Sequence, residues 1–122
     1  MDIWRANIMD HYRHPRNQGR CDQADFSAVG ANLSCGDSFS VGLKLAADTI
    51  DEIKFTGYGC AISQAAMSML SESLKGMTVK EVMALDLRFI EEIFGFKIGS
   101  RRESCALLGL ETIQKSLKKY QR

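Results

Sequence analysis

The sequence predicts an α+β fold, in which a three-stranded antiparallel sheet has helices packed around one face. Three observations lead to this prediction. Apolar residues recur at helical spacing near the N-terminus, alternate with polar residues through the middle of the chain, and return to helical spacing after Gly59. The order helix, strands, then helices is typical of a sheet covered on one side.

The first helix is expected between Asp2, which can cap it, and Pro15, which ends it. Trp4, Ile8 and Tyr12 recur on one face of this helix, and we expect Trp4 to lie in the core. A turn and a loop follow the proline.

Strand character begins at about Ala28. The clearest strand runs from Phe39 to Leu45, where apolar and polar residues alternate. A tight turn separates it from a third strand that carries Ile53 and Phe55 on one face. Because the connections are short, we expect one antiparallel meander.

Helical spacing returns after Cys60 and lasts until Gly76. Thr78–Glu81 and Ser100–Glu103 both match the capping box that opens helices. Between them, Asp86 is expected to cap a helix that ends near Gly95. The last helix carries an apolar stripe formed by Ala106, Leu110, Ile113, Leu117 and Tyr120.

Composition narrows the possible functions. The 122 residues are 45% hydrophobic and 25% charged, which predicts one globular domain over residues 1–122. The net charge of +1 argues against nucleic-acid binding. No signal peptide and no membrane span are predicted, so we expect a cytoplasmic protein. In that compartment, cysteines more often bind metals or react than form disulfides.

Three of the four cysteines fall at the ends of predicted elements. Cys35 and Asp37 flank Gly36 at the mouth of a strand. Cys60 lies at a strand-to-helix junction, and Cys105 lies about one turn into the last helix. Ends of this kind can converge at one edge of a sheet. Cys21 lies in a polar loop and is read as incidental, and the two histidines, His11 and His14, are read as a helix end and a turn.

These positions suit metal chemistry. Residues two apart on extended backbone point the same way, so Cys35 and Asp37 could face one ion. The positive end of a helix favours thiolate at Cys60 and Cys105, and thiolate is the form that binds metal and attacks sulfur. Three thiolates and one carboxylate would complete a tetrahedral shell. The alternative is that these cysteines are small buried hydrophobic residues.

Four short motifs occur in a fixed order. They are His14-Pro15-Arg16-Asn17, Cys35-Gly36-Asp37, Gly57-Tyr58-Gly59-Cys60-Ala61-Ile62-Ser63, and Cys105 at the opening of the last helix. Together they resemble the U-type iron–sulfur cluster assembly scaffold family, which comprises the IscU, SufU and NifU N-terminal groups. The resemblance runs from about Trp4 to Tyr120.

The resemblance implies that Cys35, Asp37, Cys60 and Cys105 are the ligands, with Cys35 and Cys105 as candidate persulfide acceptors. It implies sulfur from a cysteine desulfurase, a labile [2Fe–2S] cluster built with iron, and transfer to apo iron–sulfur acceptor proteins. In SufU-like members Zn²⁺ occupies the site and the protein relays sulfur. A structural zinc adaptor is the third possibility.

Two departures from the family pattern bear on these roles. Many IscU-type members have a histidine where this chain has Ser104, and the L-P-P-V-K segment read by a dedicated chaperone is absent. The resemblance therefore does not imply release by that chaperone. Arg102 and the Cys60–Ser63 stretch are SufU-like, but the insertion usual in SufU between the second and third cysteines is missing. Both the iron–sulfur and the zinc interpretations stay open.

Overall fold

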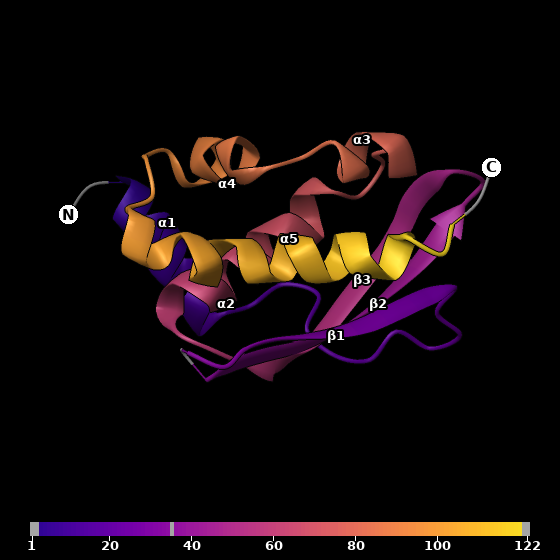
Figure 1. Ribbon diagram of the computed structural model, residues 1–122, viewed down its shortest axis with the longest axis horizontal. Coiled ribbons are helices and arrows are strands. Elements are labelled where there is room, and N and C mark those ends of the chain that lie inside the picture. Colours follow the sequence, from indigo (N-terminus) through magenta and orange to yellow (C-terminus); the bar gives the residue numbers. More distant parts are fainter. Residues whose placement is uncertain (1–2, 35, 121–122) are drawn as a thin grey trace.

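The computed structural model describes residues 3–34 and 36–120, and its architecture is the predicted α+β fold. Three strands, β1 (Phe26–Asn32), β2 (Asp37–Ala46) and β3 (Thr49–Tyr58), form an antiparallel sheet in the order β1-β2-β3. Helices stack over one face of this sheet, as Figure 1 shows. Cys35 and Asp2, which the sequence marked as a ligand and a helix cap, lie outside the described residues.

Strand register brings the site-forming ends of the strands together. Asn32 pairs with Asp37 where β1 passes into β2, and Ser38 pairs with Tyr58 at the end of β3. The loop between β1 and β2 therefore lies at the same end of the sheet as the exit from β3. At the opposite end β2 and β3 are joined by the predicted tight turn, in which Ala47 has a φ of 58°.

Two long helices build the layer on the sheet. Helix α2 (Ala61–Ser73) leaves directly from β3, and α5 (Glu103–Leu117) packs on β1 and β2. Gly30 in β1 allows this close packing, because a Cβ there would lie 2.0 Å from the Thr112 hydroxyl oxygen. Both helices begin at the end of the sheet that carries the β1–β2 loop (Figure 1).

The remaining helices cover these two. Helix α1 (Ile3–Arg13) packs on α2, whereas α3 (Val79–Met83) and α4 (Leu87–Phe94) form an outer layer (Figure 1). The predicted capping box at Thr78 and Glu81 is confirmed. Asp86 and Gly95 bound α4 as expected, and Gly95 adopts the left-handed conformation typical of a helix C-terminus.

The hydrophobic core lies between the sheet and the helices. Its largest fully buried side chains include Phe39 and Phe55 from the sheet, Met67 and Leu70 from α2, and Ile113 from α5. Phe39 and Phe55 pack edge to face, with ring centroids 6.0 Å apart. Among the described residues, no helix has the length and apolar character needed to cross a membrane.

Three local predictions are wrong. Tyr120 lies beyond the last helix, because α5 ends at Leu117. Ser100 does not cap the last helix, because residues 100–102 form a 3-10 turn (η1, Ser100–Arg102) and α5 begins at Glu103. Ile98 constrains this entry, since its side chain is buried and its N–H donates to the Glu91 carboxylate at 2.8 Å. Trp4 is 46% exposed rather than buried, because it lies over Gly95 at the edge of the fold.

Candidate metal centre

Asp37 supplies a buried carboxylate at the start of β2. Only 2% of the residue is exposed. Its Oδ1 accepts a hydrogen bond from the backbone N–H of Cys60 at 3.1 Å, which ties β2 to the start of α2. Its Oδ2 has no hydrogen-bond partner among the described residues. A buried carboxylate oxygen without a donor is unfavourable unless a cation or a proton satisfies it, so this atom has the character of an open ligand.

Glycines allow the approach of Cys60 to Asp37. A Cβ on Gly59 would lie 2.2 Å from Ser63 Oγ and 2.9 Å from Asp37 Oδ1. Gly57 has a φ of 137°, and a Cβ there would lie 2.1 Å from the carbonyl oxygen of Ser38. Only a chain without side chains at these two positions can follow this path from β3 into α2.

Cys60 is the N-cap of α2. Its backbone is extended, with φ −73° and ψ 172°, and its Sγ accepts from the backbone N–H of Ser63 at 3.5 Å. The Ser63 hydroxyl lies 3.6 Å from the same sulfur and donates to the Cys60 carbonyl at 3.1 Å. The expected placement of Cys60 at the positive end of a helix is therefore confirmed.

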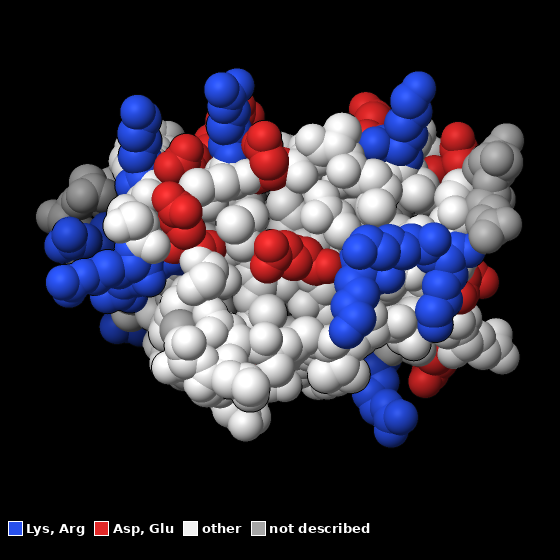
Figure 2. Space-filling model, viewed as in Figure 1, with Lys and Arg blue, Asp and Glu red and all other residues white. Residues whose placement is uncertain are grey.

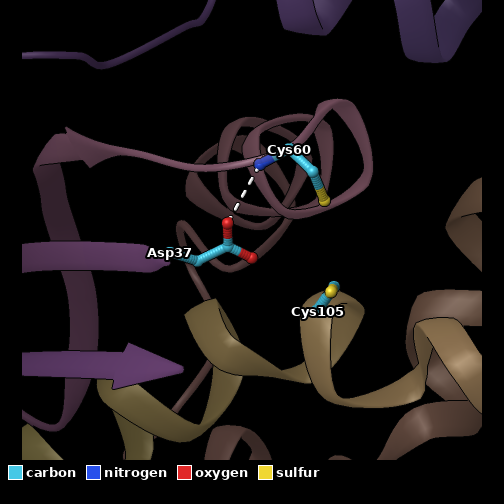
Figure 3. A group of neighbouring side chains, drawn as sticks. All are labelled: Asp37, Cys60 and Cys105. Atoms are coloured by element: carbon cyan, nitrogen blue, oxygen red, sulfur yellow. Dashed lines mark hydrogen bonds between the residues drawn. The ribbon is translucent and has the colours of Figure 1, made fainter. Parts of the chain in front are cut away.

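Cys105 approaches from the other long helix. It is the third residue of α5 and is 5% exposed. One ligand atom from each of Asp37, Cys60 and Cys105 lies within 4.8 Å of the other two. Figure 3 shows that both sulfurs and Oδ2 of Asp37 point into the same space. In the described part of the chain, this is the only such group of three His, Cys, Asp or Glu residues.

The donor set fits a thiophilic cation. Metal–sulfur distances of about 2.3 Å in a tetrahedral shell place neighbouring sulfurs about 3.8 Å apart. The observed spread is at most 4.8 Å, so small side-chain movements would close the shell. Two sulfurs and one carboxylate oxygen leave room for a fourth ligand, and Cys35 is the residue that the sequence proposes for it. These donors suit zinc or iron better than magnesium or calcium.

A cleft of about 600 Å³ opens beside the centre. Its wall includes Ala61 and Ile62, which follow Cys60, together with Trp4, Phe96 and Arg102. The cleft is mostly apolar, carries Arg5 and Arg102, and lies against the first turn of α2, but none of the three clustered side chains lines it.

The remaining candidates lie elsewhere, as the sequence analysis expected. Cys21 donates through its thiol to Glu52 Oε2 at 3.4 Å, and burial raises its pKa. His11 is buried between α1 and α2, where Nδ1 lies 2.7 Å from Ser68 Oγ. Neither residue belongs to the cluster. Ser63 belongs to a motif noted in the sequence, but its contacts with the Cys60 sulfur were not predicted, although its position three residues after an N-cap is a recognisable signal.

Comparison with known proteins identifies the family of this chain. The family model for the NifU-like N terminal domain matches residues 3–122. The zinc-dependent sulfurtransferase SufU of Bacillus subtilis is 30% identical, over 96% of this chain and 90% of the relative. The iron–sulfur cluster assembly scaffold protein IscU 1 of Archaeoglobus fulgidus is also 30% identical, over 97% of this chain and 76% of the relative.

A solved structure has the same fold. The crystal structure of FiSufU from Fervidobacterium islandicum AW-1, described as a candidate iron–sulfur cluster assembly scaffold protein for the SUF system, superposes with a TM-score of 0.78. It is 28% identical and covers 96% of both chains. Because the family match spans nearly the whole sequence, the chain belongs to the NifU-like N-terminal domain family of IscU- and SufU-type proteins.

Proposed function

We propose that the chain is a scaffold on which a labile [2Fe–2S] cluster is assembled and then passed to apo iron–sulfur acceptor proteins. The observation that carries this proposal is the buried carboxylate oxygen of Asp37, which lacks a hydrogen-bond partner in the described structure and faces two cysteine sulfurs. Carboxylates are weaker ligands than thiolates for iron–sulfur clusters. One weak ligand among thiolates suits a cluster that has to leave.

The proposed ligands are Cys35, Asp37, Cys60 and Cys105. Asp37 and Cys60 are linked by a hydrogen bond from the Cys60 N–H to Asp37 Oδ1, whereas Cys105 belongs to α5. The iron ions and the sulfide are cargo in this proposal, and the side chains of the chain hold them during assembly. We propose that cluster assembly takes place in the cytoplasm, where thiols stay reduced.

Sulfur would come from a cysteine desulfurase as a persulfide. The thiolate of Cys35 or Cys105 attacks the terminal sulfur, a new S–S bond forms, and the desulfurase thiolate leaves. This transfer needs no oxidant or reductant, because the sulfane sulfur only changes its partner. Its later conversion to the sulfide of a cluster takes two electrons per sulfur, which an external thiol reductant would supply while it is oxidised to its disulfide. Cys105 is buried, so the donor persulfide has to reach into the centre to meet it.

Anaerobic reconstitution tests the scaffold function. The protein is incubated with ferrous iron, L-cysteine, a cysteine desulfurase and a thiol reductant, and the visible absorption of a [2Fe–2S] cluster is recorded. We expect colour in the wild type and in the Cys21→Ala control, and none in Cys35→Ala or Cys60→Ala. Unchanged cluster content in the last two variants would contradict the proposal.

A zinc-dependent sulfur acceptor is the second candidate. Thiolates and one carboxylate also form a tetrahedral zinc site, and the B. subtilis relative is named as a zinc-dependent sulfurtransferase. This function predicts stoichiometric zinc in the purified protein and a marked increase in desulfurase turnover when the protein is added. Failure to stimulate its desulfurase partner, together with cluster transfer to an apo-protein, would favour the scaffold function.

A further inference from the structure

Asn32 makes three hydrogen bonds at the point where β1 ends. Its side-chain Nδ2 donates to the hydroxyl of Ser104 at 3.0 Å. Its Oδ1 accepts from the backbone N–H of Ser34 at 3.1 Å, and its backbone carbonyl accepts from the N–H of Gly36 at 2.9 Å. Asn32 is also paired with Asp37 across the strand ladder. One residue therefore contacts both the β1–β2 loop and the first turn of α5.

These contacts join two segments that carry ligands of the metal centre. Ser34 and Gly36 are the sequence neighbours of Cys35, and Ser104 immediately precedes Cys105. The two segments are 72 residues apart in the sequence and are linked here by one side-chain amide. The Asn32 side chain thus spans the distance between the end of β1 and the first turn of α5.

Few other described contacts hold the loop in place. Leu33 is 93% exposed, and Ser34 and Gly36 are exposed as well. No Lys, Arg, Asp or Glu occurs from residue 26 to residue 36, and Figure 2 shows an area without charged side chains at the lower left of the molecule, below the Lys and Arg side chains at the left end. Neither core packing nor ion pairs can therefore fix these residues. If loop residues become ordered only when a metal binds, they lose conformational entropy in the binding step. This loss lowers the affinity for the metal.

We propose that Asn32 is a positioning residue of the metal centre, which orders the β1–β2 loop in advance and holds it against the first turn of α5 through Ser104. Asn32 itself does not touch the metal. This proposal rests on the proposed function only in that the centre binds a thiophilic metal. It does not depend on whether iron or zinc is bound in the cell.

Zinc affinity of a set of variants tests the proposal. Ser104→Ala removes only the bridge, Asn32→Ala removes the bridge and the loop contact, and the double variant removes both partners. Ser104→Thr keeps the hydroxyl. Ser100→Ala is the matched control, because Ser100 is also exposed and no side-chain hydrogen bond is seen for it in the described structure.

The dissociation constant for Zn²⁺ is measured by competition with a chromophoric chelator, and the cysteine-to-metal charge-transfer band is recorded with Co²⁺. Since one hydrogen bond changes an equilibrium by about two- to tenfold, we expect about threefold weaker binding in Ser104→Ala and about tenfold in Asn32→Ala. The double variant should bind no more weakly than Asn32→Ala, because both changes break the same bridge. Ser104→Thr and Ser100→Ala should bind as the wild type does.

A second measurement needs no metal. Amide hydrogen exchange of the metal-free protein reports the order of the loop, and exchange at Ser34 and Gly36 should accelerate in Asn32→Ala and Ser104→Ala. Wild-type zinc affinity and wild-type exchange in both variants would overturn the proposal. A wild-type chain that binds neither Zn²⁺ nor Co²⁺ would overturn the proposed function instead, and the exchange data would still decide whether Asn32 orders the loop.

Discussion

Gly59 lets the chain pass close to Asp37 and Ser63 at the metal centre, so replacing it should reduce both the stability of the fold and the binding of metal. In Gly59→Ala the new Cβ would lie 2.2 Å from Ser63 Oγ and 2.9 Å from Asp37 Oδ1. Both distances are far below normal contact, so either the serine and the aspartate move or the backbone does. Any of these movements disrupts the hydrogen bond from Cys60 N–H to Asp37 and the cap of α2.

The loss of stability in Gly59→Ala can be worked out from the contacts that would be broken. A hydrogen bond to a charged group contributes about 1.5–3 kcal/mol, and an N-cap contributes about 1 kcal/mol. The alanine also restricts the unfolded chain, which offsets about 0.4–1 kcal/mol of the loss. We therefore expect Gly59→Ala to lower the free energy of unfolding by about 2–3 kcal/mol, from the balance of these contributions.

Urea denaturation of the metal-free protein measures this change, and Gly99→Ala is the matched control. Gly99 has a φ of −66°, and a Cβ there would meet no atom within 4 Å. The control should be unchanged or slightly more stable. Equal unfolding midpoints and equal zinc affinities for the two variants would refute the view that close packing at Gly59 builds the site.

Three further predictions follow from the same structure. In Asp37→Ala, cluster transfer to an apo-acceptor should be slower than in the exposed-residue control Asp51→Ala, because the weak oxygen ligand is gone; equal transfer rates would count against this role. Burial lowers the pKa of His11, so the fold favours its neutral form. The stability that this form contributes is fully present above the unfolded pKa of about 6.5. It is lost as the pH falls below that value, so the unfolding free energy should fall less in His11→Gln than in the wild type between pH 7 and pH 5. Chelation of bound metal should leave far-UV circular dichroism unchanged, since the hydrophobic core cluster between the sheet and α2 and α5 does not include the proposed ligands; loss of most helical signal would indicate a structural zinc module.

Local sequence signals predicted the elements well. The α+β order, the meander and the caps at Thr78 and Asp86 depend on residues close together in the sequence, so periodicity and capping rules suffice. The same holds for Cys60, whose helix-capping position follows from the two glycines before it.

Contacts between distant residues could not be predicted in this way. His11 is buried because Ser68 of α2 offers it a hydroxyl, and a helical pattern read from α1 alone gives no sign of that partner. Ser100 matches a capping box, yet the anchoring of Ile98 to Glu91 gives the chain a different entry into α5. Asn32 and Ser104 meet across 72 residues. Ser104 stands out in the sequence as the position of the family histidine, but no local pattern predicts its hydrogen bond to Asn32.

The central claim is that Cys35 of the β1–β2 loop, Asp37 of β2, Cys60 at the N-cap of α2 and Cys105 of α5 hold one ion. X-ray absorption at the zinc edge tests it most directly. For the zinc-loaded wild type, we predict three sulfurs at about 2.3 Å and one oxygen at about 2.0 Å. Cys105→Ala should lose one sulfur and Cys21→Ala should lose none. A first shell made only of nitrogen and oxygen, or a sulfur count that Cys105→Ala leaves unchanged, would contradict a centre built from these residues.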